Sequence, residues 1–359
     1  MKLCFTALAL WSLIAAGLRA QENWGTIRGT VKDSSRAVIP GATLTATSPT
    51  LVRPIEVATD DKGTYLFPKL PIGTYTITAS LTGFKTVRKE DIPVRLGLEP
   101  TVDFVLAVGN VSETITVTAA NGAVDVTSSK TVTSITDQII DSTPKGRRFD
   151  TILGYAPGVR RETKAGTAGV GGYQIDGASG SENVFIIDGV EVSDIRRGSL
   201  GVDNSIPFEF VKEVQVKSGG FEAEYGGAVG GVINVATRSG TNDFHGEGSM
   251  MFTNAGLNSN SRGTWQRVPG DVTTAEFFRQ REDEYRTWYP GFALGGPIIK
   301  DRVHFFTSYF PEVSRTERTT TFTTDNSTRV STQRIIRHYG LARADYAPTQ
   351  KIQINSSFL

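Results

Sequence analysis

Short runs in which apolar and polar residues alternate recur along most of this chain of 359 residues, and they restrict its fold more than any other feature. In the clearest run, Tyr75, Ile77 and Ala79 alternate with hydroxylated residues. An extended strand with this pattern has one apolar and one polar face. Similar runs, separated by turn residues, occur at 25–32, 42–47, 52–59, 64–67, 74–81, 84–89 and 101–108. Seven short strands in one segment predict a small β-sandwich over residues 24–108.

The N-terminus has the organisation of a secretory signal peptide. Lys2 precedes an apolar stretch over 3–18, and a cleavage site of small residues follows at Ala20. A membrane anchor is the alternative, but the stretch is close to the minimum length for a spanning helix. Cleavage after Ala20 removes the only cysteine, Cys4. We therefore expect a mature chain without a disulfide, a thiolate metal site or a cysteine nucleophile.

The charge of the chain is almost balanced, with 38 Lys+Arg against 37 Asp+Glu. This balance argues against a nucleic-acid partner and against a polybasic membrane anchor. The 38 glycines and the frequent Thr and Ser are typical of an exported β protein rather than of a helical enzyme.

Residues 124–240 predict a compact α+β domain. Short helices are expected at 136–140 and 147–153, an exposed glycine-rich loop at 166–180, and a hairpin at 183–192 with Asp188-Gly189 at its turn. Two further strands, 211–216 and 232–237, enclose a glycine run over 225–231. Because glycine has no Cβ, such a run permits close backbone approach or positive φ angles. We expect these two strands to pair as a hairpin in the core of the domain.

A linker over 109–123 contains a short strand, 111–119, in which Ile115 and Val117 are apolar and hydroxylated residues lie between them. This strand has two interpretations. It is the last strand of the sandwich or a simple tether, or it is a segment that a partner captures by strand addition.

Residues 241–359 show the pattern of transmembrane β-strands, which need about 9–11 residues each. Candidate strands occur at 244–252, 291–299, 302–310, 335–346 and 351–359. Between them we expect a long loop to about 289, a tight turn at 300–301, a long loop at 311–334 and a turn at 347–350. No apolar run after the signal is long enough for a spanning helix. Because five strands cannot close around a domain of this size, we expect a fragment of a longer reading frame.

No constellation of catalytic or cofactor-binding residues stands out, so we expect neither an enzyme nor a cofactor or metal site. The histidines, none with a second His or Cys at ligand spacing, are His245, His304 and His338. Asp60 and Asp61 suit a turn better than a calcium site. The glycine run lacks the helix that a dinucleotide site needs. The arginine pairs at 147–148 and 160–161 suit a solvated face or ion pairs with barrel carboxylates better than an anion site.

The sandwich segment resembles the carboxypeptidase regulatory-like domain. The likeness rests on GTIRGTVKDSSRAVIPGATLTAT and DDKGTYLFPKLPIGTYTITASLTGFK, and its most specific part is the motif Asp60-x-x-Gly63-x-Tyr65-x-Phe67. The resemblance implies a sandwich similar to transthyretin and to some carbohydrate-binding domains, without a catalytic site.

The next segment resembles the plug domain of TonB-dependent outer-membrane receptors. The motifs RRFDTILGYAPGV, SENVFIIDGVEV and VKEVQVKSGGFEAEYGGAVGGVINVATRSG occur in the order typical of that family. In the family a TonB box precedes the plug, and the corresponding segment here is ETITV: Glu113, Thr114, Ile115, Thr116 and Val117. This context favours the capture function for the linker strand. The plug core motif comprises Asn183, Asp188, Gly189, Tyr225, Gly226, Gly230, Gly231 and Asn234.

The resemblance implies a mainly β protein of the outer membrane, with a seven-stranded sandwich in the periplasm, an α+β plug and the first strands of a barrel. The expected segments are 1–20, 24–108, 109–123, 124–240 and 241–359. The implied function is energy-coupled uptake of a siderophore, an oligosaccharide or a peptide, without a cofactor. The implied partners are a TonB-type energising protein, outer-membrane lipid and, on some branches, a surface lipoprotein. Adhesion or signalling without transport is the alternative.

Overall fold

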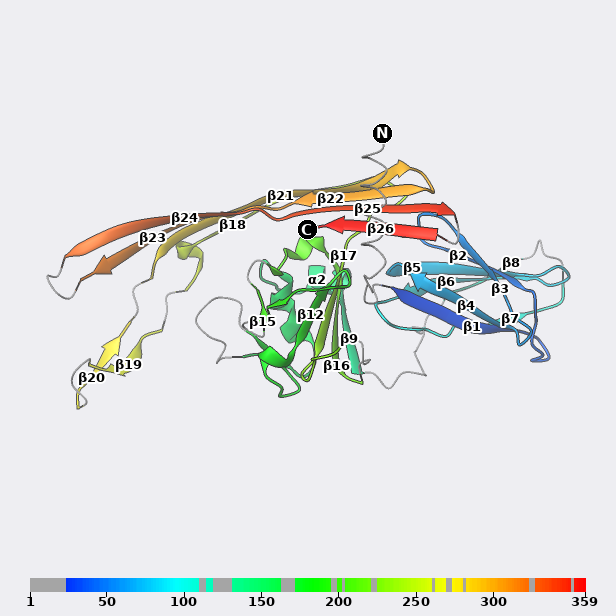
Figure 1. Cartoon of the computed structure of the whole chain (residues 1–359), viewed down its shortest axis with the longest axis horizontal. Helices are drawn as coiled ribbons and strands as arrows, with labels where there is room; N and C mark the ends of the chain where they lie inside the picture. The colour runs from blue at the N-terminus through cyan, green and yellow to red at the C-terminus, as the bar shows by residue number, and fades with distance from the viewer. Residues whose placement is uncertain are drawn as a thin grey trace, which may run out of the picture.

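Strands dominate the computed structural model, as the alternating runs predict, and they form three units in chain order (Figure 1). We call them the sandwich, the plug unit and the wall sheet. Figure 1 places the plug unit beneath the middle of the wall sheet and the sandwich at one end of it. Within the described residues, no helix is long and apolar enough to cross a membrane. The structure describes residues 24–109, 114–118 (backbone), 131–162, 172–194, 199–201, 204–220, 225–259, 262–268, 273–279, 282–322, 327–349 and 352–359, so the expected signal peptide lies outside them.

The sandwich contains all seven predicted strands, arranged as two sheets of order β4-β1-β7 and β3-β2-β5-β6-β8. Alternation explains the core, because Tyr75, Ile77 and Ala79 on one face of β5 are fully buried. They pack with Phe67 and Phe104 from the other sheet. The strands are β1 (Gly25–Asp33), β2 (Thr43–Thr47), β3 (Ile55–Ala58), β4 (Thr64–Leu70), β5 (Gly73–Ser80), β6 (Thr86–Val94) and β7 (Phe104–Leu106), and the linker adds β8 (Thr114–Thr118).

The plug unit is built on a sheet of order β13-β12-β17-β16-β9. The predicted hairpin is confirmed, since β16 and β17 pair antiparallel. The Asp188-Gly189 turn is also confirmed; both residues have positive φ, 47° and 79°, as a type I′ turn requires. The strands of this sheet are β9 (Thr131–Thr136), β12 (Val184–Ile187), β13 (Val190–Glu191), β16 (Val211–Gly219) and β17 (Val232–Thr237).

The helices and loops of the plug unit differ in part from the prediction. The first helix is present as α2 (Asp137–Ser142), but the second is a 3-10 helix, η2 (Phe149–Tyr155), shifted toward the C-terminus. The predicted loop over 166–180 is wrong at its C-terminal end, because β11 (Tyr173–Ile175) pairs with β10 (Val159–Arg161). Its first part lies outside the described residues. The remaining short elements are η3 (Gly180–Glu182), β14 (Ser193–Asp194), β15 (Ser199–Leu200) and η5 (Phe208–Phe210).

The wall sheet is an antiparallel series that contains the predicted strands, with several differences. The loop predicted to about 289 is wrong at its end, because β21 begins at Glu284, and the turn predicted at 347–350 is wrong in part, because β25 runs to Thr349. The strand predicted over 335–346 is divided, because β24 ends at Arg337 and β25 begins at Gly340. The loop predicted over 311–334 is wrong, because these residues form a hairpin of β23 and β24. β22 and β23 pair with successive parts of β21. β24 pairs with β23, as β25 pairs with β22. β-Branched threonine, frequent here, favours extended backbone even without a core to face. The elements are β18 (His245–Asn254), η6 (Ala255–Leu257), β19 (Thr264–Arg267), β20 (Ala275–Phe278), β21 (Glu284–Ile299), β22 (Val303–Tyr309), β23 (Glu312–Thr321), β24 (Thr328–Arg337), β25 (Gly340–Thr349) and β26 (Ile352–Phe358).

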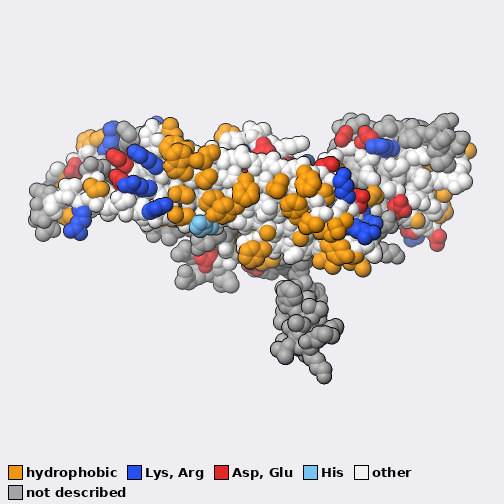
Figure 2. Space-filling view, turned by 90° about the horizontal axis from the view of Figure 1, so that it is seen from above, with side chains coloured by type: hydrophobic (Ala, Val, Ile, Leu, Met, Phe, Trp, Pro, Cys, Tyr) orange, Lys and Arg blue, Asp and Glu red, His pale blue; other side chains and the backbone are white. Residues whose placement is uncertain are grey.

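The two faces of the wall sheet differ in chemistry. Its outer face carries exposed apolar side chains over the middle of the sheet, whereas Lys and Arg side chains lie toward the tip of β23 and β24 (Figure 2). This arrangement suits a lipid-facing band with a polar extension beyond it. The inner face packs against the plug unit. Exposed apolar residues of the outer face are Met250, Phe252, Trp288, Phe292, Leu294, Ile298, Tyr309, Tyr346, Ile354 and Phe358.

Candidate functional site

The glycines at the end of the glycine run let the plug unit fold tightly upon itself. A Cβ at Gly231 would lie 2.6 Å from the Cδ1 atom of Ile175. A Cβ at Gly230 would lie 2.5 Å from the Oδ1 atom of Asn183. Such separations are shorter than real contacts, so a larger residue at either position would have to displace a neighbouring side chain. Their place in the core supports a structural function for the motif.

The polar residues of the plug core motif are also buried within the unit. Asn183 is 4% exposed, and its Nδ2 atom donates to the backbone oxygen of Tyr173 (2.5 Å). Asn234 lies in the middle of β17, opposite Ile186 of β12 and Gln215 of β16. The structure therefore gathers these residues around one sheet.

A buried lysine stabilises the base of the glycine run. The Nζ atom of Lys217, on β16, donates to the hydroxyl of Tyr225 (3.1 Å) and lies 4.5 Å from the centre of its ring. Both residues are almost fully buried, whereas Gly226, the next residue, is exposed at a turn. The sequence pattern identified Tyr225, but it did not indicate that Lys217 contacts its ring and hydroxyl.

The turn residue Asp188 links the plug unit to the wall sheet. Its carboxylate accepts hydrogen bonds from the backbone N–H (2.9 Å) and the hydroxyl (2.5 Å) of Thr237. The guanidinium of Arg343, on β25, lies 4.0 Å from the same carboxylate and donates to Asp345 of the wall (3.0 Å). One wall arginine thus lies between a plug carboxylate and a wall carboxylate.

A second link is centred on Arg147. Its guanidinium forms an ion pair with Glu209 of the plug unit. It also lies over the rings of Tyr289 (5.2 Å) and Phe310 (5.4 Å), both from the wall sheet. The expectation of a barrel carboxylate as partner is wrong for Arg147. Its anion, Glu209, is on the plug, and its wall contacts are aromatic rings and the sulfur of Met251. Burial raises the pKa of Glu209, and the nearby arginine opposes this shift.

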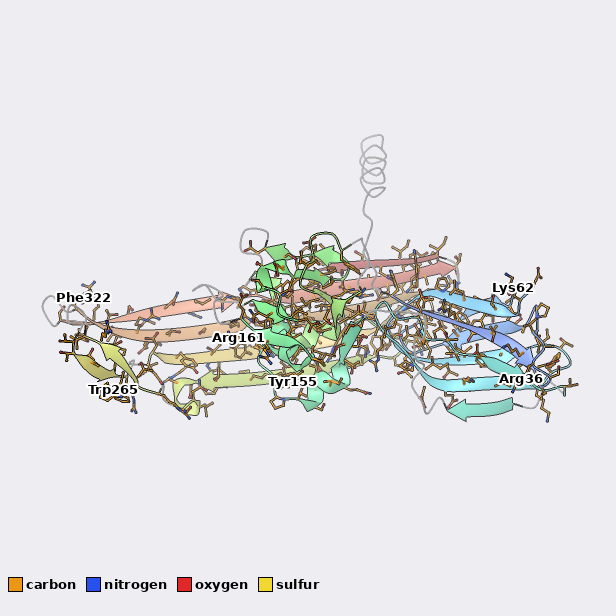
Figure 3. The ribbon with its side chains drawn as sticks, turned by 90° about the horizontal axis from the view of Figure 1, so that it is seen from below. Arg36, Lys62, Tyr155, Arg161, Trp265 and Phe322 are labelled. Atoms are coloured by element: carbon orange, nitrogen blue, oxygen red, sulfur yellow. The ribbon has the colours of Figure 1, made fainter. Side chains whose placement is uncertain are left out.

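We expect Arg147→Ala to destabilise the plug unit by about 3–5 kcal/mol, because it leaves Glu209 buried without its cation. Hydrogen exchange of the amides in 204–219, measured on the purified chain, would report the change as loss of protection. The exposed Arg161, on β10 (Figure 3), supplies the control: Arg161→Ala should change stability by less than about 0.5 kcal/mol. Unchanged exchange in Arg147→Ala would show that the pair does not stabilise the plug.

The sandwich contacts both other units. The side-chain amide of Gln215, on β16, donates to the backbone oxygen of Leu96 in the sandwich. Glu213, on the same face, is fully buried, and this burial raises the pKa of its carboxyl. The side chain of Ser134 and the positive charge of Arg95 oppose this rise of the pKa. The alternation in β16 predicts one polar face, and the structure shows that this polar face is buried as well.

The sandwich reaches the wall sheet near the end of β25. There the guanidinium of Arg53 donates to the backbone oxygen of Pro348 (3.4 Å). The sandwich is therefore in contact with the plug unit through Leu96 and with the end of β25 through Arg53.

The TonB-box-like segment lies on the sandwich. Thr114 to Val117 belong to β8, which pairs in parallel with β6. Glu113 lies outside the described residues. The strand thus takes the position of a last sandwich strand, the first of its two interpretations. Its position leaves the second interpretation open, because strand addition uses the backbone.

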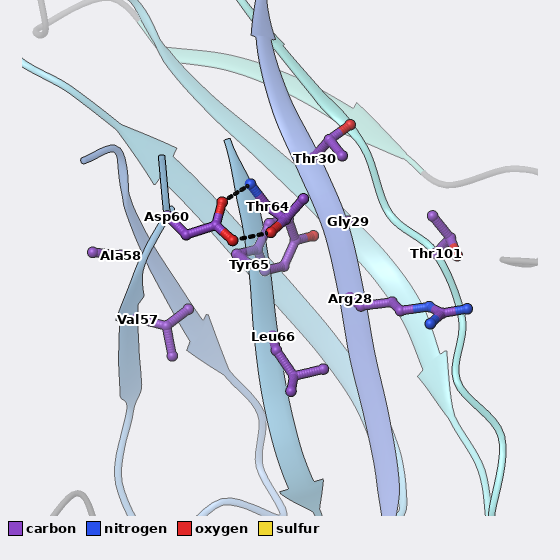
Figure 4. Close-up of a pocket in the computed structure, with 10 residues that line it drawn as sticks. All are labelled: Arg28, Gly29, Thr30, Val57, Ala58, Asp60, Thr64, Tyr65, Leu66 and Thr101. Atoms are coloured by element: carbon purple, nitrogen blue, oxygen red, sulfur yellow. Dashed lines mark hydrogen bonds between the residues drawn. The ribbon is translucent and has the colours of Figure 1, made fainter. Parts of the chain in front are cut away.

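A hollow of about 830 Å³ on the sandwich is lined by residues of the paired strands β1 and β4 and of β3 (Figure 4). Polar groups that line the hollow form hydrogen bonds within the sandwich. The carboxylate of Asp60 accepts hydrogen bonds from the backbone N–H (2.8 Å) and the hydroxyl (2.5 Å) of Thr64. These hydrogen bonds lower the pKa of Asp60, and the bond from the Thr64 hydroxyl has the largest effect. Asp60 therefore acts as the turn residue that the sequence predicts.

The histidines make local contacts. His304, fully buried, places its Nε2 atom 2.9 Å from the Oδ1 atom of Asn242. His338 contacts the hydroxyl of Tyr309 (2.6 Å). In the part of the chain that the structure describes, no group of three or more His, Cys, Asp or Glu residues is placed to hold a metal ion.

Comparison with known proteins gives matches along the whole described chain. Residues 26–107 match the carboxypeptidase regulatory-like domain, residues 125–232 the TonB-dependent receptor plug domain, and residues 236–345 an outer membrane beta barrel domain. The TonB-dependent transporter Oar of Myxococcus xanthus is 32% identical over 324 residues, which are 86% of this chain and 29% of Oar.

Two further proteins are similar over smaller shares of the chain. The ferrienterobactin receptor of Escherichia coli (strain K12) is 34% identical over 154 residues, 39% of this chain and 20% of the receptor. The solved outer membrane transporter YddB from Escherichia coli is 14% identical with a TM-score of 0.46, over 61% of this chain and 31% of YddB. The chain spans less than a third of the length of each of these proteins.

Proposed function

The chain belongs to the TonB-dependent receptors of the outer membrane, and from this premise we propose that it forms part of a transporter for energised uptake of a scarce or bulky substrate. In this proposal the plug unit closes the path through the wall, and a TonB-type energising protein opens it by capturing Glu113–Val117 as an added strand. The sandwich then lies on the periplasmic side, where that protein acts.

The observation that carries this proposal is the connection from β8 to the edge of the plug sheet. β9 follows β8 in the chain, and among the described strands β16 alone pairs with it. Of its six residues only Ile135 is buried. A pull on β8 would therefore reach the plug sheet first at an edge strand that a single neighbour holds.

The substrate would enter at the other end of the wall sheet. There Trp265 and Phe322 lie far from Arg36 and Lys62 of the sandwich (Figure 3). One relative is named for ferrienterobactin, so an iron-carrying siderophore is the first class to test, followed by oligosaccharides and peptides. The family membership supports transport over catalysis.

The proposal is tested by uptake measurements in cells that express the gene for this chain. We expect uptake of the matching labelled substrate to stop when the energising protein is deleted or the proton gradient is dissipated, while surface binding continues. Binding without energised uptake for every substrate class would instead support adhesion or signalling.

A further inference from the structure

Strand β8 fills a defined position on the edge of the sandwich. It pairs with β6 through five consecutive residues, from Thr86 opposite Thr114 to Glu90 opposite Thr118, without a shift of register. The other edge of β6 pairs with β5. β8 is therefore the outermost strand of this sheet, and it covers backbone groups of β6 that its own removal would expose.

The edge of β6 offers room for a strand of about this length. On one side, the backbone N–H of Lys85 is already bonded to the oxygen of Ala107 (2.8 Å), and Phe84 bridges Val108. On the other side, Asp91 has a φ of 57°, which turns the backbone out of the extended conformation. The straight segment between these limits is 86–90, and β8 pairs with all of it.

The sandwich that holds β8 is itself in contact with the rest of the molecule. Gln215 of the plug unit is hydrogen-bonded to Leu96, and Arg53 is hydrogen-bonded to Pro348 near the end of β25. A force on β8 would therefore load the sandwich and these contacts as long as β8 stays on β6. It would reach β9 only after β8 leaves.

We propose that the β6 edge is a holding site for Thr114–Thr118, so that the sandwich and the energising protein compete for the same strand. This inference rests on the proposed function. The sandwich then regulates coupling, because the strand is free for capture only during the fraction of time that it spends away from β6. If that fraction is about one tenth, the apparent affinity of the energising protein falls about tenfold.

A disulfide between the paired strands tests the holding site. Arg88 and Thr116 are opposite each other in the register, and the side chain of Arg88 is exposed. Neighbouring strands lie about 4.8 Å apart, within the range that a disulfide spans. In a Cys4→Ser background, Arg88→Cys with Thr116→Cys should cross-link on oxidation. Arg88→Cys with Val117→Cys should not, because a shift of one residue turns the side chain to the opposite face.

Capture by the purified periplasmic domain of the energising protein is then measured on the full chain. We expect the oxidised Arg88→Cys, Thr116→Cys variant to bind at least about tenfold more weakly than its reduced form, and reduction to restore binding. Equal binding of the two forms would overturn the competition, and failure to cross-link would overturn the register. If no form of the chain is captured although the cross-link forms, the proposed function and the competition are refuted, while the pairing of β6 with β8 is established.

Discussion

Replacing Ile115 by proline is expected to abolish energised uptake while substrate binding stays unchanged. Proline has no backbone N–H and fixes φ near −65°, so it removes one donor from the middle of β8. Capture by strand addition depends on main-chain hydrogen bonds, and β8 has only five residues to offer. The end of the wall sheet at which we propose that the substrate enters lies far from the sandwich (Figure 1). Uptake of the labelled substrate should therefore fall to the level of cells without the energising protein.

Ile115→Val is the matched control, because it keeps the backbone N–H and the β-branched side chain. It should transport like the wild type. Binding to whole cells, measured at saturation, shows that the proline variant reaches the outer membrane in normal amount. Normal transport by Ile115→Pro would count against the assignment of this strand as the captured segment.

The strands of the fold could be predicted from the sequence wherever one face of a strand meets a core. Alternation in β5 gave the sandwich core, and Asp188-Gly189 gave a type I′ turn, because both signals are local. The hairpin of β23 and β24 was missed for the opposite reason. Its residues are mostly polar, and its few apolar residues do not alternate regularly, so no periodicity distinguishes it from a loop. Its extended form depends on the pairing of β23 with β21.

The candidate site could be predicted only in part, because its main contacts join residues far apart in the chain. The glycines at 230 and 231 stand out in the sequence, but the partner of Arg147 does not. Glu209 follows it by 62 residues, and the aromatic rings over its guanidinium come from another unit. Gln215 and Leu96 are 119 residues apart. The alternation in the linker allows a last strand of the sandwich, but it does not identify β6 as the strand that it pairs with.

A disulfide that ties β9 to β16 is expected to block uptake as completely as the proline does, but at the plug rather than at the captured strand. Thr131 and Gly219 are opposite each other in the register. A Cβ placed at Gly219 would lie 3.9 Å from the Oγ1 atom of Thr131, an ordinary contact distance, and Gly219 does not require a positive φ. Thr131→Cys with Gly219→Cys in a Cys4→Ser background should therefore cross-link without strain. The covalent bond prevents a pull from removing β9.

The oxidised variant should bind substrate and capture the energising protein normally, yet transport nothing until a reductant is added. Each single cysteine variant should transport in both redox states. A second cross-link, Thr43→Cys with Ala58→Cys between β2 and β3, controls for a general effect of a disulfide, since this pair lies at the edge of the sandwich sheet away from β8. Because a plug that leaves as one body would keep β9 and β16 together, full transport by the oxidised variant would mean that β9 is not removed. Loss of transport in the oxidised state alone would identify β9 as the first strand to separate.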